Sequence, residues 1–239
     1  MESKKSRCVA IVLAAGAGKR MQSQVKKQFL MIKEKPVLYY SLKAFEESFV
    51  DEIVLVTSEE DLDFCRKELV GKYGFAKVKS IVAGGNERYH SVAAGLSSIE
   101  EADYVFIHDA ARPMLTGEIL ERAYACVKAN GACVVGMPVK DTIKIANAEG
   151  YIDQTPDRNL VWMIQTPQVF GYKLIKEAYE KLIVQEKELK GAGVNITDDA
   201  MVVEALTNHA VKLVEGSYEN IKITTPEDLG IAERFLGTI

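Results

Sequence analysis

The fold is decided by Cys8-Val9-Ala10-Ile11-Val12-Leu13-Ala14-Ala15-Gly16-Ala17-Gly18-Lys19-Arg20-Met21. A short apolar run that ends in small residues and glycines is typical of a buried strand followed by a turn. The backbone N–H groups of such a turn can approach phosphate oxygens closely. Lys19, Arg20, Lys26 and Lys27 add positive charge here, although the chain as a whole is acidic. This stretch therefore predicts a loop that holds a nucleoside triphosphate at the end of a buried strand.

Two familiar phosphate-binding motifs do not fit this loop. A Walker loop requires Ser or Thr after Gly-Lys and a glycine five residues before that Gly, but Arg20 and Leu13 stand there. A dinucleotide fingerprint requires Gly or Ala where Met21 stands, and no strand ending in an acid follows about 20 residues later. A structural turn with incidental lysines is the remaining alternative.

Outward from this stretch, apolar runs alternate with amphipathic segments. The expected strands are 8–13, 53–56, 78–83, 104–107, 132–137, 211–214 and 220–223. The expected helices include one that starts near Pro36, 59–73, 91–98, 117–129, 172–188, one from Asp198, and 226–236. This alternation predicts an α/β fold, with a parallel or mostly parallel sheet and helices on both faces. Ligands bind such sheets outside the carboxyl ends of the strands, so we expect the site in the polar segments that follow the strands.

The segment 140–163 interrupts the alternation. Residues 142–145 and 151–153 alternate like strands around a turn at 148–150. We predict a β-hairpin arm that projects from the main sheet, with a hairpin lying on the domain surface as the alternative. Because the chain shows no repeat, low-complexity stretch or linker, we expect one domain over 1–239.

Two polar segments follow expected strands. Gly84-Gly85-Asn86-Glu87-Arg88-Tyr89-His90-Ser91 has glycines that let the backbone face a base or a ribose, and Ser91 could cap the next helix. It could also be an ordinary turn. In His108-Asp109-Ala110-Ala111-Arg112-Pro113, the carboxylate of Asp109 suits Mg²⁺, and Arg112 could bind a substrate phosphate. His108 as a metal ligand or general base is the alternative, although the three histidines show no metal-binding spacing.

The later polar motifs have both structural and functional interpretations. They are Lys140-Asp141-Thr142, Asp157-Arg158, Gln165-Thr166-Pro167-Gln168, Thr197-Asp198-Asp199-Ala200 and residues 220–229. Thr197 could be a helix N-cap, and Thr225-Pro226-Glu227 is a good helix start. Lys222 alternates with Ile221 and Ile223, so on an expected strand it points away from them, as a solvated edge lysine also would.

The bulk composition excludes several classes of protein. The chain has 239 residues, 48% of them hydrophobic, which is enough for a substantial core. A net charge of −4 argues against nucleic acid as a partner. No apolar run is long enough to span a membrane, and residues 8–15 predict a strand rather than a signal peptide. Cys8, Cys65, Cys126 and Cys133 lack zinc-site spacing, so we expect free thiols and a cytoplasmic enzyme.

These motifs, in this order over nearly the whole chain, resemble those of the 2-C-methyl-D-erythritol 4-phosphate cytidylyltransferase family of the non-mevalonate isoprenoid pathway. The resemblance covers about residues 9–235 and depends on several separate motifs. It implies a Rossmann-like nucleotidyltransferase fold, CTP as co-substrate, Mg²⁺ as cofactor, and a homodimer joined through the arm. The implied reaction transfers CMP from CTP to the polyol phosphate, giving 4-diphosphocytidyl-2-C-methyl-D-erythritol and pyrophosphate.

The resemblance also implies roles for the residues that match the family's motifs. Arg20 and Lys27 would stabilise the transition state, while Arg158 and Lys222 would position the acceptor phosphate. The predicted nucleotide-binding residues are Ala14, Ala15, Gly16, Gly18, Gly85, Asn86 and Ser91. The predicted substrate contacts are Asp109, Arg112, Thr142 and Thr166, and Asp109 would also bind the metal. Many family members have Pro before the catalytic Lys, whereas this chain has Lys26, which could partly substitute for Lys27.

The implied mechanism is an in-line attack by a phosphate oxygen of the acceptor on the α-phosphorus of CTP. That oxygen is already ionised at neutral pH, so catalysis requires positioning and charge neutralisation rather than a general base. The nearest alternative is a ribitol 5-phosphate cytidylyltransferase, which shares most of these motifs. An NAD(P)-dependent oxidoreductase and a non-catalytic nucleotide-binding regulator are the alternatives from other classes.

Overall fold

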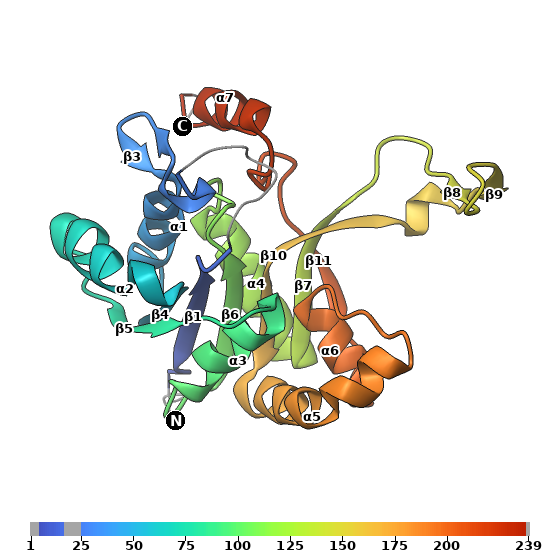
Figure 1. Cartoon of the computed structure of the whole chain (residues 1–239), viewed down its shortest axis with the longest axis horizontal. Coiled ribbons are helices and arrows are strands. Elements are labelled where there is room, and N and C mark those ends of the chain that lie inside the picture. Colours follow the sequence, from blue (N-terminus) through green and yellow to red (C-terminus); the bar gives the residue numbers. More distant parts are fainter. Residues whose placement is uncertain (1–4, 17–24, 238–239) are drawn as a thin grey trace.

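The computed structural model describes residues 5–16 and 25–237. Its centre is a seven-stranded sheet in the order β11-β7-β10-β6-β1-β4-β5 (Figure 1). The strands are β1 (Cys8–Leu13), β4 (Glu52–Thr57), β5 (Val78–Ala83), β6 (Tyr104–Asp109), β7 (Ala132–Pro138), β10 (Trp162–Gly171) and β11 (Lys212–Glu215). β10 runs antiparallel to β6 and β7, and the other strand pairs described in this sheet are parallel. The predicted mostly parallel α/β sheet is confirmed.

The side chains of β1 show why the sheet is covered on both faces. Cys8, Ala10 and Val12 belong to one apolar cluster, whereas Val9 and Ile11 belong to the other. This is the two-residue alternation of a strand, and all five residues are at most 1% exposed. A strand that is apolar on both faces requires helices on both sides of the sheet.

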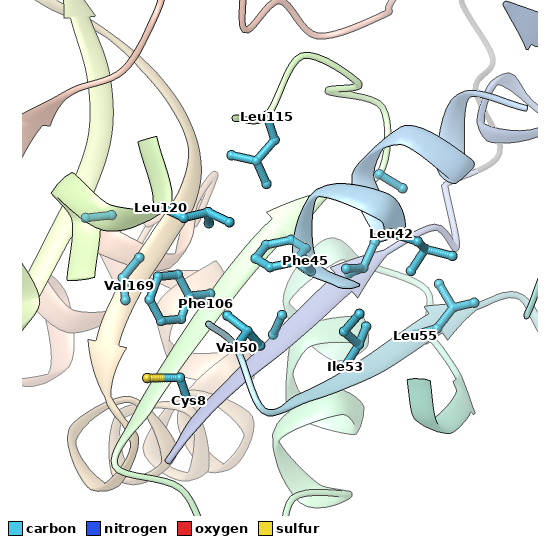
Figure 2. Close-up of a cluster of buried hydrophobic side chains, with 14 of the residues drawn as sticks. Cys8, Leu42, Phe45, Val50, Ile53, Leu55, Phe106, Leu115, Leu120 and Val169 are labelled. Carbon is cyan, nitrogen blue, oxygen red and sulfur yellow. The ribbon is translucent and has the colours of Figure 1, made fainter. Parts of the chain in front are cut away.

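Most of the helices pack into one or the other of these two clusters. The helices are α1 (Val37–Glu46), α2 (Leu62–Phe64), α3 (Arg88–Ser97), α4 (Gly117–Asn130), α5 (Tyr172–Gly191), α6 (Asp199–Leu206) and α7 (Pro226–Phe235). α1 and α4 pack into the cluster that Figure 2 shows around Phe45 and Phe106. α3, α5 and α6 pack into the other cluster, so the expected helices on both faces are confirmed. Among the described residues, no helix has the length and apolarity needed to cross a membrane.

A third, smaller cluster closes the end of the sheet near the site. It joins the short strands β2 (Met31–Ile32) and β3 (Lys35–Pro36) to α1 and α7. Ile32, Val37, Ile223 and Ala232 are each at most 1% exposed there. This cluster fixes the segment that precedes α7, in which Lys222 lies.

Two helix starts differ from the sequence expectation. α3 begins at Arg88 rather than Ser91, because its N-cap is Glu87, whose side chain forms a capping box with the first turn. α6 is capped by Asp198 rather than Thr197, since the Asp198 side chain accepts a hydrogen bond from Met201 N at 3.0 Å. In both cases a carboxylate satisfies the free N–H groups of the first turn.

Three other elements differ from the sequence expectation. The helix expected at 59–73 is a 3₁₀ turn, Glu59–Asp61, followed by α2 and a π-helical stretch, Cys65–Gly71. β10 was not expected, because its apolar pattern is broken by polar residues. Residues 220–223 form no strand; Ile223 N instead donates to Ala111 O at 2.8 Å.

The arm continues from β7 and β10 and projects away from the sheet (Figure 1). Near its tip, β8 (Ile145–Ala146) pairs with β9 (Ile152–Gln154), so the paired part is much shorter than expected. A 3₁₀ turn, Arg158–Leu160, lies on the returning side. Ile152 is 65% exposed and Leu160 is 80% exposed, so the arm carries apolar side chains in the open.

Candidate active site

A cavity of about 340 Å³ lies at the carboxyl ends of β1, β5 and β6. It is lined by Leu13, Ala14, Ala15, Gly16, Lys27, Gln28, Gly85, Asn86, Glu87, Arg88, Ser91, Asp109, Ala110, Ala111 and Lys222. The lining includes most of the nucleotide-binding residues predicted from sequence, together with Lys27, Asp109 and Lys222. Segments far apart in the sequence therefore meet where an α/β sheet binds ligands.

The floor of the cavity is a backbone surface held in place on several sides. Ala14 N donates to Val56 O at 2.6 Å, and the buried Gln28 side chain donates from Nε2 to Ala14 O at 2.6 Å. A Cβ on Gly85 would collide with His90 Cβ, so α3 can approach the turn only because this residue is glycine. Gly85 N also donates to Ser91 Oγ at 3.2 Å. Ser91 thus supports the turn from inside the first turn of α3.

Lys26 and Lys27 have different surroundings. Lys27 lines the cavity and donates from Nζ to Ile223 O at 3.2 Å. Lys26 Nζ is bonded to Glu60, to Asp61 Oδ2 at 2.6 Å and to Ser58 Oγ at 2.9 Å. The ammonium group of Lys26 is thus occupied by the turn that follows β4, while that of Lys27 lies at the cavity.

Asp109, the last residue of β6, lies between two cations. Lys222 Nζ donates to Oδ2 at 2.6 Å, and Arg88 Nε donates to Oδ1 at 3.2 Å. Burial alone would raise the pKa of Asp109, but the charges of Arg88 and Lys222 hold that pKa well below its usual range. Asp109 therefore stays ionised, and the three charges form one electrostatic unit at the cavity wall.

His108 is fully buried beside this unit, and burial lowers its pKa to about 4. Its Nε2 lies 3.2 Å from the carbonyl oxygen of Arg112, so Nε2 carries the hydrogen. Nδ1 then accepts from the Thr166 hydroxyl at 3.0 Å, and Thr166 Oγ1 accepts from Asp109 N at 3.1 Å. The neutral ring holds the end of β6 through both nitrogens, which argues against His108 as a general base or metal ligand.

Several residues predicted from sequence lie outside the cavity lining. Thr166 is buried in the contacts just described, and Arg112 donates to the backbone oxygens of Asn220 at 2.7 Å and Ile164 at 3.3 Å. Thr142 and Arg158 are exposed on the arm, where Arg158 Nη1 donates to Lys140 O at 3.3 Å. Gly18 and Arg20 lie outside the described residues.

Sequence reasoning gave no role to Arg88 or to Gln28. Arg88 is part of the segment 84–91 that the sequence singled out, and Gln28 directly follows Lys27. The available signal was a lone arginine three residues after the glycines of a turn, at a position that begins a helix. Its partner Asp199 is 111 residues away, which explains why no local pattern revealed the pair.

The sheet, the backbone floor of the cavity and the Lys27, Lys222, Arg88 and Asp109 charges are those of an α/β nucleotidyltransferase. Residues 8–238 match the model of the family described as 2-C-methyl-D-erythritol 4-phosphate cytidylyltransferase. The chain belongs to this family and is a cytidylyltransferase of isoprenoid precursor biosynthesis.

Curated relatives and solved structures agree with this assignment. A 2-C-methyl-D-erythritol 4-phosphate cytidylyltransferase of Lachnoclostridium phytofermentans is 50% identical over 227 residues, covering 95% of each chain. One of Lachnospira eligens is 53% identical over 228 residues, covering 95% of this chain and 98% of the relative. The crystal structure of 4-diphosphocytidyl-2C-methyl-D-erythritol synthase from Anaerococcus prevotii superposes with a TM-score of 0.84 at 33% identity, covering 97% of this chain and 96% of that chain. None of these favours the ribitol phosphate, oxidoreductase or regulator alternatives.

Proposed function

We propose that this cytidylyltransferase binds CTP in the 340 Å³ cavity and passes CMP to 2-C-methyl-D-erythritol 4-phosphate, with release of pyrophosphate. The observation that carries the proposal is the meeting of Lys27, Arg88, Lys222 and Asp109 beside a backbone floor at the carboxyl ends of the strands. Bare backbone suits a base and phosphates, and fixed cations suit a transferring phosphoryl group. The domain extends over 1–239, with 140–163 as its arm.

Catalysis in this site would consist of positioning and charge stabilisation. The acceptor's phosphate oxygen is already a nucleophile at neutral pH, and the described residues that line the cavity include no imidazole or thiol that could act as a base. Lys27 would meet the negative charge that develops around the α-phosphate, together with Arg20 from the phosphate loop. Lys222 and Arg112 would position the acceptor, with Thr166 supporting the end of β6.

Mg²⁺ fits the donor set of the cavity. Within the described residues, no cluster of three or more His, Cys, Asp or Glu side chains could hold a metal alone. Mg²⁺ usually takes one or two carboxylates, substrate phosphates and waters, and Asp109 supplies such a carboxylate. A carboxylate has about four lone-pair sites, so its contacts with Arg88 and Lys222 leave room for an ion. Bound Mg²⁺ would neutralise the triphosphate and orient the leaving group.

The arm supports a homodimer with shared sites. Arg158 and Thr142 are exposed on the projecting arm, outside the cavity lining of their own chain (Figure 1). An isolated two-stranded hairpin is marginal in water, and this one exposes Ile152 and Leu160. A second copy that covers the arm would bury these side chains and receive Arg158 at its acceptor phosphate. The free thiols of Cys8, Cys65, Cys126 and Cys133 agree with a cytoplasmic enzyme.

One end-point assay tests the proposed function. The enzyme is incubated with Mg²⁺, CTP or ATP, and either 2-C-methyl-D-erythritol 4-phosphate or ribitol 5-phosphate, and pyrophosphate is measured. Release is expected with CTP and the methylerythritol phosphate, because the backbone around Ala14, Ala15 and Gly85 can hydrogen-bond the edge of a pyrimidine. Equal turnover with ATP would contradict cytidylyl selectivity, and a preference for ribitol 5-phosphate would contradict the acceptor.

A further inference from the structure

A buried ion pair connects the cavity to the start of α6. Arg88 Nη1 and Nη2 donate to Asp199 Oδ1 and Oδ2, each at 2.8 Å. Asp199 is fully buried and also accepts from the Tyr179 hydroxyl at 2.6 Å. A bidentate guanidinium–carboxylate pair fixes orientation as well as distance. Asp199 therefore determines how the Arg88 side chain lies.

The third nitrogen of the same guanidinium group, Nε, reaches the cavity wall at Asp109. Arg88 lines the cavity and its Nε donates to Asp109 Oδ1 at 3.2 Å. Since Asp199 holds both terminal nitrogens, the Nε edge of the group is left to face Asp109. The position of the Arg88 charge in the cavity thus follows from a residue that does not line the cavity.

Asp199 is in turn held by the core of the sheet. The Gln168 side chain, from β10, accepts through Oε1 from Asp199 N and Ala200 N, both at 2.9 Å. Gln168 Nε2 donates to Asp198 Oδ2 at 3.0 Å. These bonds fix the first turn of α6 against β10. They also give a structural reason for Gln168 and for the motif Thr197-Asp198-Asp199-Ala200, to which the proposed reaction assigns no role.

We propose that Asp199 is a positioning residue for CMP transfer and acts through Arg88. A buried ion pair contributes little net stability compared with a well-packed apolar pair, so stability alone gives no reason for it. A cation held rigidly at the cavity wall, by contrast, acts on charge that develops during transfer without reorganising. The inference depends on the proposed binding of CTP in this cavity.

The test is a double-mutant cycle with Asp199→Asn, Arg88→Met and the double variant. Displacing a positioned group by about 1 Å can cost about a hundredfold in rate. We therefore expect Asp199→Asn to lower kcat by about 10- to 100-fold, with a smaller change in KM for CTP. Because Asp199 acts through Arg88, the double variant should have the same kcat as Arg88→Met. The matched control is Asp198→Asn, which keeps a capping side chain on the same helix and should retain kcat.

Asp199→Glu covers the case in which Asp199→Asn does not fold. It keeps the ion pair but moves the guanidinium group by one methylene, so a folded Asp199→Glu enzyme should also lose kcat. Two results would overturn the proposal: losses in kcat that multiply in the double variant, or a lower Tm for Asp199→Asn with unchanged kcat per folded enzyme. Calorimetric titration of the unaltered enzyme with CTP decides the proposed function separately. Failure to bind CTP would contradict the proposed function, whatever the cycle gives.

Discussion

At the scale of single residues, adjacent side chains of one type perform different tasks. Lys26 is bonded to Asp61 and Ser58 on the turn after β4, whereas Lys27 lines the cavity. Lys26 thus anchors the start of the 3₁₀ turn, Lys27–Phe29, that presents Lys27. The sequence left open whether Lys26 shares the role of Lys27, and these contacts favour Lys27 alone.

The first prediction contrasts the two lysines. Lys27→Ala should raise the barrier by about 2–4 kcal/mol, or lower kcat by about 30- to 1000-fold, with a smaller effect on CTP binding. Lys26→Ala should retain most of kcat and lower Tm, because it loses an anchor. Steady-state kinetics and thermal unfolding of both variants provide the measurement. A greater loss of kcat in Lys26→Ala than in Lys27→Ala would reverse the assignment.

The second prediction concerns His108 and acid. Its folded-state pKa of about 4 lies below the ordinary 6.5, so between these values the unfolded chain binds the proton and the folded protein does not. Its contribution to the free energy of unfolding should therefore fall as pH decreases through this window, by about 2 kcal/mol at pH 5, and be constant above pH 7. Denaturant unfolding at pH 7 and pH 5 measures this. The His108→Gln variant should lose less free energy of unfolding between pH 7 and pH 5 than the unaltered protein. An equal loss would contradict the lowered pKa of His108.

At the scale of elements, the arm presents apolar side chains without cover from its own chain. Leu160 is 80% exposed on the arm, and Val184 is 85% exposed on α5, so they make a matched pair. If the arm forms the dimer contact, Leu160 would be buried in it and stabilise association, whereas Val184 on α5 would stay exposed and contribute nothing to association.

The third prediction follows from this pair. Leu160→Asp should shift the protein towards monomers, because a carboxylate would have to be buried in the contact without a partner. Val184→Asp should leave the association unchanged. Sedimentation velocity at several concentrations distinguishes the two variants. Identical behaviour of Leu160→Asp and the unaltered protein would place the dimer contact elsewhere.

Elements with a strong local pattern were predictable from sequence, and elements defined by distant contacts were not. The strand at Cys8–Leu13 has a continuous apolar run that ends in small residues, so a buried strand could be predicted there directly. β10 contains Gln165 and Gln168, which look like surface residues but bond to Ser217 O and to the start of α6. In the site, the cavity backbone and Lys27 were recognised, whereas the Arg88–Asp199 pair exists only once the chain has folded.

At the scale of the whole molecule, the proposed role of the arm implies that a single subunit lacks a complete site. Arg158 lies on the arm and outside its own cavity lining, so we expect it to act on the neighbouring subunit. The residues of the cavity and of the arm would then belong to different chains of one dimer.

The fourth prediction tests this by subunit complementation. Lys27→Ala and Arg158→Ala subunits, each nearly inactive alone, are mixed in equal amounts under conditions that allow exchange. With Arg158 acting on the neighbour, a mixed dimer has one site with both substitutions and one site with neither. Random pairing makes about half the dimers mixed, so about a quarter of unaltered activity should return. No recovery in a sample shown to contain mixed dimers would rule out a shared site.

The arm also has an entropic consequence for a lone subunit. Trp162 is paired with Pro138, so β7 and β10 already meet at the base of the arm, where a short turn could join them. The chain instead closes a much longer connection, and each doubling of loop length costs about 0.6 kcal/mol. Replacing residues 140–160 by a four-residue turn should therefore make an isolated subunit more stable by roughly 1.5 kcal/mol. Each chain thus closes a long connection at a cost to its own stability, and an ordered surface from a second copy would offset that cost.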